Sequence, residues 1–188
     1  MIASVDVTDI RIETQRLILR PWQESDLQDF YEYASVPGVG EMAGWKHHSS
    51  LAESRMILDM FIRDQKTFAL EWKESGKVIG SLGLEEPVPD PTTGELCGRE
   101  IGYVLAKDYW GMGIMPEAVH AVIKYCFNTL HFDFLTCGHF LRNDRSRRVV
   151  EKCGFVYFGE SRYETRYDTV EISRNYILYN PTSEVIYV

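Results

Sequence analysis

Two glycines one residue apart, Gly111 and Gly113, stand at a place in the sequence where chemistry could occur. A strand-like run from Glu100 to Leu105 precedes them, and an amphipathic helical pattern follows them to about Leu130. Glycine lets the backbone turn sharply, and the first N–H groups of a helix have no intrahelical partner and lie at the positive end of its dipole. This order of strand, glycine turn and helix start predicts a phosphate-binding site.

The turn does not match the two common nucleotide-binding fingerprints. The sequence contains no G-x-x-x-x-G-K-[ST] motif, and Pro116 stands where G-x-G-x-x-G would need its third glycine. Proline suits a first helical turn, because the N–H that it lacks would be unpaired there. The alternative interpretation is an ordinary tight connection from strand to helix, since two glycines need structural context to count as a motif.

Length and composition indicate one globular domain. We expect the 188 residues to form a single domain, 1–188, with a core of about 10–180. Hydrophobic residues make up 45% and charged residues 26%, as in ordinary folded proteins. The net charge of −8 disfavours binding to nucleic acids or acidic membranes and suits a cationic or amine substrate.

The remaining sequence signals argue against metal sites, disulfides and membrane spans. The four cysteines are scattered and include no C-x-x-C pair, and the adjacent His47 and His48 have no third ligand at a recognisable spacing. No stretch approaches the roughly 18 apolar residues of a membrane span, and residues 1–9 lack the apolar segment of a signal peptide. We therefore expect a cytoplasmic protein with reduced thiols and no metal.

Hydrophobic periodicity predicts strands and helices mixed along the chain, which is typical of an α/β domain. The predicted strands cover residues 10–21, 67–72, 78–84, 99–105, 134–140, 155–158 and 171–178. The predicted helices begin after Ser25 or Asp26, at Ser50, at Pro116 and at Ser146. Ser50 and Glu53 have the spacing of a capping box, and the strands at 67–72 and 78–84 form a hairpin.

Three stretches together resemble the GCN5-related N-acetyltransferase (GNAT) family. They are EIGYVLAKDYWGMGIMPEA at 100–118, NDRSRRVVEKCGF at 143–155 and ETQRLILRPWQESDLQDFY at 13–31. The branch that they most resemble contains the ribosomal-protein N-terminal acetyltransferases. The resemblance implies a mixed, mostly antiparallel sheet of about six to seven strands flanked by about four helices. It also implies transfer of the acetyl group of acetyl-CoA to a primary amine, by direct attack in a ternary complex.

The resemblance assigns the binding of acetyl-CoA to two backbone segments. In the family pattern Q/R-x-x-G-x-G/A, Trp110 takes the first position, Gly113 the glycine and Met115 the place of the final small residue. The family's pyrophosphate donors correspond to the backbone of Trp110, Gly111, Met112, Gly113, Ile114 and Met115. The family's strand end, which splays from its neighbour and pairs with the pantetheine arm, corresponds to Tyr103, Val104 and Leu105. One N–H there aimed at the acetyl carbonyl would stabilise an oxyanion by roughly 3 to 4 kcal/mol.

Two side chains match the family's catalytic positions. Glu100 aligns with the strand glutamate that serves as the base in some members, and its alternative interpretation is a solvated strand residue. Glu85 and Glu86 are the alternates for the base. Many members use a tyrosine as the acid for the leaving thiolate, but the matching position here is Val150. The terminal-amine branch instead has a serine near the sulfur, which is Ser146, and a hydroxyl there would donate a hydrogen bond to the thiolate. Its alternative role is to satisfy backbone donors at a helix start.

The same segment carries the remaining expected contacts with acetyl-CoA. Asn143 is expected to bind the pantetheine. Arg145, Arg147 and Arg148 are candidates to meet the adenosine phosphate, and we expect at least two of them to form a solvated basic helix face instead.

Three hypotheses on function remain open from the sequence. The leading one is N-acetyl transfer to a protein N-terminus or a small-molecule amine. The second is a catalytically inactive CoA-binding sensor or interaction module, which the valine at 150 favours. The third is a nucleotide-binding module, against which the missing lysine and Pro116 argue. We expect the acceptor cleft between residues 36–48, 85–98 and 162–168, and edge strands that suit a homodimer.

Overall fold

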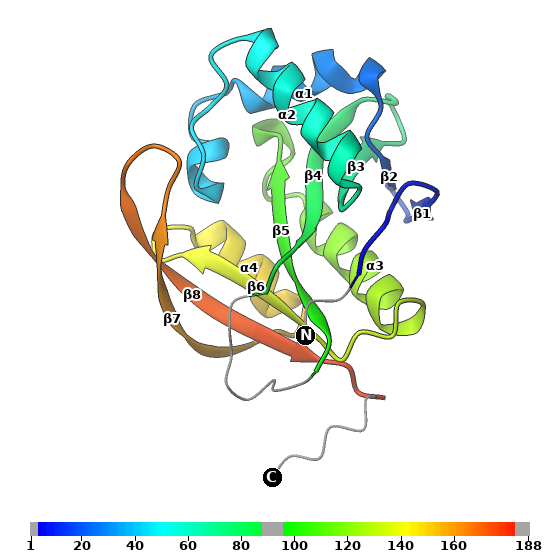
Figure 1. Cartoon of the computed structure of the whole chain (residues 1–188), viewed down its shortest axis with the longest axis vertical. Helices are drawn as coiled ribbons and strands as arrows, with labels where there is room; N and C mark the ends of the chain where they lie inside the picture. Colours follow the sequence, from blue (N-terminus) through cyan, green and yellow to red (C-terminus); the bar gives the residue numbers. More distant parts are fainter. Residues whose placement is uncertain (1–3, 88–95, 183–188) are drawn as a thin grey trace.

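The protein folds around one open sheet, seen in a computed structural model that describes residues 4–87 and 96–182 (Figure 1). Within these residues the sheet has eight strands, accompanied by four α-helices. The strands are β1 Ile12–Glu13, β2 Leu17–Pro21, β3 Thr67–Trp72, β4 Val78–Glu85, β5 Gly98–Leu105, β6 Phe134–Phe140, β7 Val156–Glu164 and β8 Val170–Tyr179. The helices are α1 Leu27–Ala34, α2 Leu51–Asp64, α3 Ile114–Asn128 and α4 Asp144–Lys152.

The strand order is β1-β2-β3-β4-β5-β6-β8-β7, and only β5 and β6 are parallel neighbours. Their pairing is short: it joins Gly98–Glu100 to Phe134–Thr136. β5 then continues along β4 as far as Leu105 while β6 turns away, so the two strands diverge beyond Glu100 (Figure 1). The sheet therefore opens in its middle.

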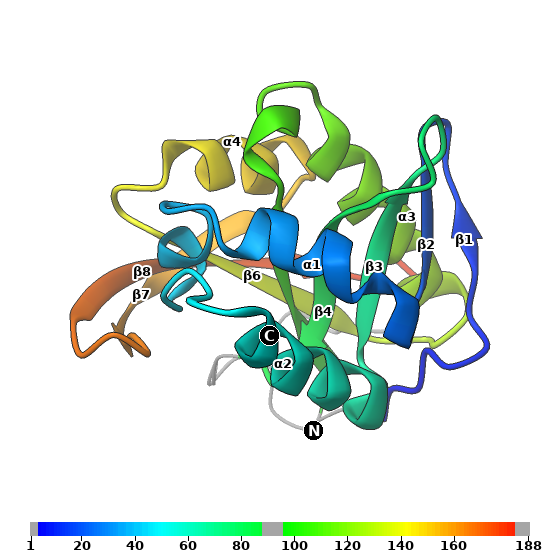
Figure 2. The ribbon, with the colours of Figure 1, turned by 90° about the horizontal axis from the view of Figure 1, so that it is seen from above.

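Helices cover both faces of the sheet, α1 and α2 on one and α3 and α4 on the other (Figure 2). The larger hydrophobic core lies on the α3 face and includes Leu82, Ile101, Val119 and Leu135. A second core on the α1–α2 face is rich in aromatic residues, with Trp22, Phe30, Tyr33 and Leu58. Each face of the sheet therefore has its own core, and Ala106 and Trp110 pack against both.

The predicted α/β class and mostly antiparallel sheet are confirmed, with one strand more than expected. Residues 10–21 form two strands instead of one, because the chain reverses between Glu13 and Leu17 and pairs with itself. The predicted capping of α2 holds at Ser50, whose side chain accepts from the Glu53 N–H at 3.2 Å, while the Glu53 carboxylate accepts from Ser49. α3 begins two residues before Pro116, and α4 begins at Asp144, two residues before Ser146.

Candidate active site

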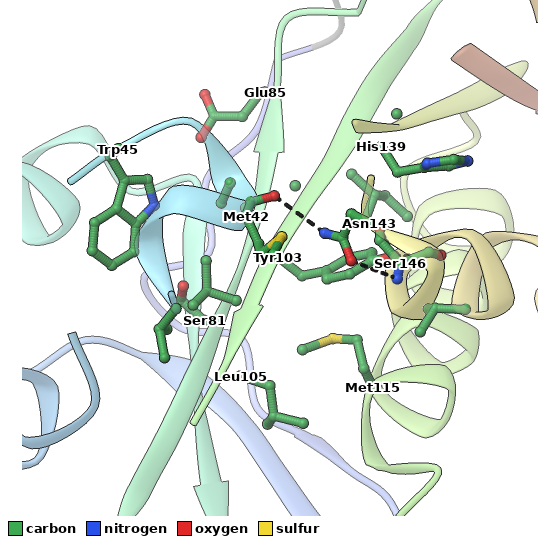
Figure 3. A pocket seen from close by; sticks show the side chains of 18 of the residues that line it. Met42, Trp45, Ser81, Glu85, Tyr103, Leu105, Met115, His139, Asn143 and Ser146 are labelled. Atoms are coloured by element: carbon green, nitrogen blue, oxygen red, sulfur yellow. Dashed lines mark hydrogen bonds between the residues drawn. The ribbon is translucent and has the colours of Figure 1, made fainter. Parts of the chain in front are cut away.

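A cavity of about 960 Å³ lies where β5 and β6 diverge. The second half of β5 forms its floor, and it extends to both faces of the sheet (Figure 3). On the α3–α4 side it is lined by Trp110, Gly113, Met115, Asn143, Arg145 and Ser146. On the α1–α2 side it is lined by Met42, Trp45, Phe61, Glu85, Glu100 and Tyr163. The segments predicted to bind acetyl-CoA and the loops predicted to frame the acceptor cleft therefore line the same cavity.

The glycine turn adopts the backbone that was predicted for it. Gly111 and Gly113 have φ angles of 80° and 73°, in the left-handed region that favours glycine, and Gly113 is the N-cap of α3. The N–H groups of Ile114 and Met115 belong to the first turn and lack intrahelical partners. The positive end of α3 thus faces the cavity, with unpaired donors suited to an anion.

The residues at the two ends of the predicted donor run are already engaged in the protein. The N–H of Trp110 donates to the Lys107 carbonyl at 3.1 Å, and its indole N–H donates to the Leu105 carbonyl at 2.8 Å. The Met115 side chain is buried against the core on the α3 face and lines the cavity, while its N–H belongs to the first turn of α3. The predicted donor set narrows to the N–H groups from Gly111 to Met115.

Strand geometry also divides the residues at the end of β5. The Ala106 N–H bonds to the Ile79 carbonyl on the β4 side. Backbone groups of successive strand residues point to opposite sides, so those of Val104 also face the partner β4. The N–H groups of Tyr103 and Leu105 therefore face the opening toward β6, where a substrate backbone could pair.

Arg16 is a residue at the glycine turn that the sequence reasoning missed. Its Nη1 donates to the Met112 carbonyl at 3.0 Å, and its Nε donates to Glu117 Oε2 at 2.7 Å. Thr14 also donates to Glu117, at 2.6 Å. Burial acts to raise the pKa of Glu117, but the hydrogen bonds from Thr14 and Arg16 lower it below its usual value. The β1–β2 turn therefore fixes the first turn of α3 and brings a guanidinium beside the predicted phosphate site.

Ser146 lies in the first turn of α4 and is buried at the cavity wall. Its Oγ is 2.8 Å from the hydroxyl oxygen of Tyr103, which reaches across from β5. Val150, at the position of the family's acid, is buried in the core. The structure thus brings a tyrosine to the predicted serine from a different element.

The Asn143 side chain connects α4 to the loop before α2. Its Oδ1 accepts from the Ser146 N–H at 3.1 Å, and its Nδ2 donates to the Met42 carbonyl at 3.2 Å (Figure 3). Asn143 therefore caps α4 and holds the loop, so any pantetheine contact would add to bonds that the side chain already makes.

The three arginines of α4 have different surroundings. Arg145 and Arg148 line the cavity, and the Arg145 guanidinium lies 4.7 Å from the centre of the Trp110 ring. Arg147 pairs with Asp144 at 3.3 Å and with Glu151 at 3.5 Å on the exposed surface of the helix. Two of the three arginines therefore line the cavity while remaining exposed, and Arg147 forms ion pairs along the helix surface.

A pair of carboxylates lies on the α1–α2 side of the opening. Glu85 and Glu100 are direct partners in the β4–β5 register, and the neighbouring pair on the same face is Gly83 and Gly102. A Cβ added at Gly102 would meet only the Glu85 Cγ, at 3.9 Å. A Cβ added at Gly83 would instead meet Glu85 Oε1 at 2.9 Å and Thr67 Oγ1 at 3.2 Å, so the Glu85 carboxylate lies over Gly83. The glycine at 102 therefore leaves a hollow next to the carboxylates, and Lys66 forms an ion pair with Glu85.

Two predicted loops border this hollow and are tied to each other. The Arg166 N–H donates to the Gly44 carbonyl at 2.8 Å, and the Tyr167 hydroxyl and Arg142 guanidinium donate to the Glu41 carbonyl at 3.1 and 2.9 Å. The β7–β8 hairpin therefore holds the loop before α2 over the cavity. Of the predicted third loop, Glu85 and Glu86 line the cavity, and residues 88–95 lie outside the described residues.

The adjacent histidines take part in local contacts. His47 Nδ1 is 2.7 Å from Glu41 Oε1, and His48 Nδ1 is 2.7 Å from Ser54 Oγ. Burial lowers the pKa of His48, so its ring is neutral near pH 7. Across residues 4–87 and 96–182, no cluster of three or more His, Cys, Asp or Glu side chains is placed to hold a metal ion. In the same ranges, no helix has the length and apolar character needed to cross a bilayer.

Comparison with known proteins shows the family of this chain. The sequence model of the family described as an acetyltransferase (GNAT) domain matches residues 16–156. The uncharacterized N-acetyltransferase p20 of Bacillus licheniformis is 31% identical over 147 residues, which cover 76% of this chain and 80% of the relative.

Solved structures share the fold at lower identity. The crystal structure of a GNAT-family acetyltransferase from Bacillus anthracis has a TM-score of 0.78 and 20% identity, covering 91% of this chain and 99% of that one. The ribosomal-protein-S5-alanine acetyltransferase from Vibrio fischeri has a TM-score of 0.71 and 21% identity, covering 93% and 98%. At these identities the likeness concerns the fold.

Proposed function

The chain belongs to the GNAT acetyltransferase family and is an acetyl-CoA-dependent acyltransferase, and we propose that its cavity joins acetyl-CoA to a primary amine for direct transfer. The observation that carries this proposal is the opening between β5 and β6, with the glycine turn on one side and the Glu85–Glu100 pair on the other. The glycine turn, suited to an anion, and the Glu85–Glu100 pair, suited to a cation, therefore lie on opposite faces of β5.

On the α3–α4 side, we assign the diphosphate of acetyl-CoA to the N–H groups from Gly111 to Met115. Arg145 and Arg148 supply positive charge for the adenosine phosphate. The pantetheine arm pairs with the backbone groups of β5 that face the opening, chiefly those of Tyr103, since the Leu105 carbonyl already accepts from Trp110.

On the α1–α2 side, we assign the acceptor amine to the hollow over Gly102, beside the Glu85 carboxylate. Glu100 removes a proton from the ammonium, directly or through a water, and the neutral nitrogen attacks the acetyl carbonyl. A backbone N–H of β5 facing the opening stabilises the oxyanion that forms. The C–S bond then breaks, its electron pair goes to sulfur, and the hydroxyl of Ser146 donates a hydrogen bond to the thiolate.

The acceptor is either a protein N-terminal α-amine or a small-molecule amine. The carboxylates on the α1–α2 side of the cavity favour an acceptor with a positively charged group. The apolar and aromatic side chains around them favour an acceptor whose remaining atoms are uncharged. The apolar and aromatic wall residues include Met42, Trp45, Phe61, Phe140 and Tyr163.

A catalytically inactive CoA-binding module is the second candidate, and the buried Val150 at the position of the family's acid favours it. A thiol-release assay with acetyl-CoA separates the two. The panel contains peptides with free N-termini, polyamines, aminoglycosides and amino acids. Release of CoA with one class of amine supports the transferase; CoA binding without release from any amine supports the inactive module.

We also propose a single-domain cytoplasmic protein that forms a homodimer. The four cysteines are free thiols, three of them buried, which suits a reducing compartment. β7 is an edge strand and exposes Val156 and Tyr157, with Val170 and Ile172 exposed on its partner β8. Light scattering coupled to gel filtration gives the mass of the particle, and a monomer at micromolar concentration would contradict the dimer.

A further inference from the structure

The hydroxyl groups of Tyr103 and Ser146 form a pair at the cavity wall whose geometry indicates a role in the reaction. They come from β5 and α4, 43 residues apart in the sequence, and their oxygens lie 2.8 Å apart. Both residues line the cavity, while the Ser146 side chain itself is buried. The pair therefore bridges the two elements between which the thioester of acetyl-CoA is assigned, so this inference rests on the proposed function.

The bonds around Ser146 favour one direction for the hydrogen bond. The Ser146 N–H donates to Asn143 Oδ1 at 3.1 Å, which fixes the residue at the start of α4. The Tyr103 hydroxyl lies 3.3 Å from the Ser146 carbonyl and 2.8 Å from its Oγ, so the closer acceptor is the Oγ. A tyrosine hydroxyl that donates to this Oγ leaves the proton of Ser146 free to point into the cavity.

Other groups nearby are less suited to face the sulfur. His139 lines the cavity, but its Nδ1 lies 2.9 Å from the Phe140 carbonyl and its Nε2 lies 3.3 Å from the Tyr176 hydroxyl. Val150, at the position of the family's acid, has no polar atom in its side chain and is buried. Among the described cavity residues, Ser146 thus carries the hydroxyl group at the start of α4, and Tyr103 is its hydrogen-bond partner.

We propose that Tyr103 is a positioning residue for catalysis: its hydroxyl donates to Ser146 Oγ and turns the Ser146 O–H toward the leaving sulfur. In the step, the N–C bond forms, the C–S bond breaks and its electron pair goes to sulfur. The Ser146 hydroxyl stabilises the thiolate by a hydrogen bond and keeps its proton. The nitrogen loses two protons, one from the ammonium to Glu100 before attack and one after the N–C bond has formed. One of them reaches the sulfur by way of solvent, and the other is released to solvent.

The surroundings of Tyr103 keep its hydroxyl protonated. Burial raises its pKa well above the usual value, and the nearby thiols of Cys137 and Cys153 add to this. Burial also raises the pKa of both thiols, to about 11 for Cys153, so neither carries a negative charge near neutral pH. The contribution of Tyr103 is therefore expected to be the same across an assay range of about pH 6 to 9.

The test compares Tyr103→Phe, Ser146→Ala and the double variant in two-substrate thiol-release kinetics. Each single substitution is expected to lower kcat about tenfold, since the bond lost involves a charged sulfur, with the KM for acetyl-CoA within about twofold of wild type. The double variant is expected to be no slower than Ser146→Ala, because Tyr103 acts through Ser146. The pH profile of Tyr103→Phe is expected to be parallel to that of wild type.

Tyr125→Phe is the matched control. Tyr125 also packs against the core of the α3 face and lies outside the cavity lining, so losing its hydroxyl should leave kcat unchanged. Thermal unfolding and CoA titration are run on every variant. A Tyr103→Phe protein that loses CoA binding would assign the hydroxyl to the fold and overturn the proposal.

The remaining outcomes also decide the question. Wild-type kcat in Tyr103→Phe, or losses that multiply in the double variant, would overturn the positioning role while leaving the transferase intact. No thiol release by the wild-type protein with any amine would contradict the proposed function and this inference with it.

Discussion

The two sides of the cavity are built in different ways. The α3–α4 side uses backbone: two glycines at positive φ, the free N–H groups of a helix start and the open edge of a strand, mostly within residues 98–118. The α1–α2 side uses side chains from segments far apart, among them Trp45, Phe61, Glu85 and Tyr163. The binding groups on the α3–α4 side come mostly from one short segment of the chain. The binding groups on the α1–α2 side are brought together only when the whole domain has folded.

The two sides of the cavity also carry opposite charges. Arg16 and Arg145 lie beside the glycine turn and Arg148 lines the cavity, while Glu85 and Glu100 lie on the other face. Opposite charges on the two faces suit a diphosphate and an ammonium. If this division is correct, substitutions on one side should change the kinetics of one substrate and leave the other unaffected.

The largest effect is expected at Glu100, the proposed base on the α1–α2 side. Glu100→Gln removes the proposed base and keeps its size, so kcat should fall at least about a hundredfold with acetyl-CoA affinity preserved. Steady-state rates and CoA calorimetry measure the two quantities. Glu85→Gln and Glu86→Gln are the comparison variants, and a larger loss in either of them would move the base away from Glu100.

A smaller, one-sided effect is expected at the glycine turn. Gly113 has φ 73°, so Gly113→Ala puts a side chain in the left-handed region at a cost of about 1 to 2 kcal/mol and distorts the turn. The KM for acetyl-CoA should rise about tenfold, with the KM for the amine within about twofold.

Gly76→Ala is the control for backbone strain, because Gly76 has φ 71° in a turn outside the cavity lining. It should cost similar stability in urea unfolding without changing either KM. A rise in the KM for acetyl-CoA in this control would mean that lost stability, and not the phosphate site, explains the Gly113 result.

The reciprocal effect is expected in the glycine hollow. Gly102→Ala adds a methyl group with only one neighbour, 3.9 Å away, so the fold should tolerate it while the hollow is filled. The KM for the amine should rise about fivefold and that for acetyl-CoA should stay constant, as expected from steric exclusion of roughly 1 kcal/mol. Gly159→Ala in β7, where an added Cβ has no neighbour within 4 Å, is the control. Equal effects on both substrates would place Gly102 outside the acceptor site.

An effect on stability, with no change expected in the chemical step, is predicted for the loop before α2. Burial acts to raise the pKa of Glu41, but hydrogen bonds from His47 and Gly38 lower it to about 2. A lowered folded-state pKa adds stability above the usual carboxyl pKa of about 4.5, and this is lost as the pH falls toward about 2. Glu41→Gln should therefore cost about 1 to 2 kcal/mol at pH 7, measured by urea unfolding, and much less near pH 2. A difference that stays constant with pH would contradict this.

The sequence predicted the features that depend on short segments and missed those that depend on tertiary packing. The positive-φ turn at Gly111 and Gly113 follows from residue type and short-range order, and the structure has it. The register that opposes Gly83 to Gly102 depends on strand pairing, which no single segment specifies. Tyr103 was assigned through its backbone, because its contact with Ser146 needs β5 and α4 in their final positions.

Arg16 shows the same limit. It lies in a stretch that carried the family resemblance, yet its bond to Met112 spans 96 residues and follows from the packing of the β1–β2 turn on α3. Local rules predict elements and turns, and only tertiary packing decides which side chains meet.

The central claim is that both substrates occupy this cavity together and react directly. Two-substrate initial-rate kinetics of thiol release, with acetyl-CoA and an accepted amine varied together, test it most directly. Direct transfer within a ternary complex predicts that the double-reciprocal lines intersect. Parallel lines would indicate a covalent acetyl-enzyme, and CoA binding without release from any amine would indicate a protein that holds the cofactor without transferring its acetyl group; either result would contradict the account.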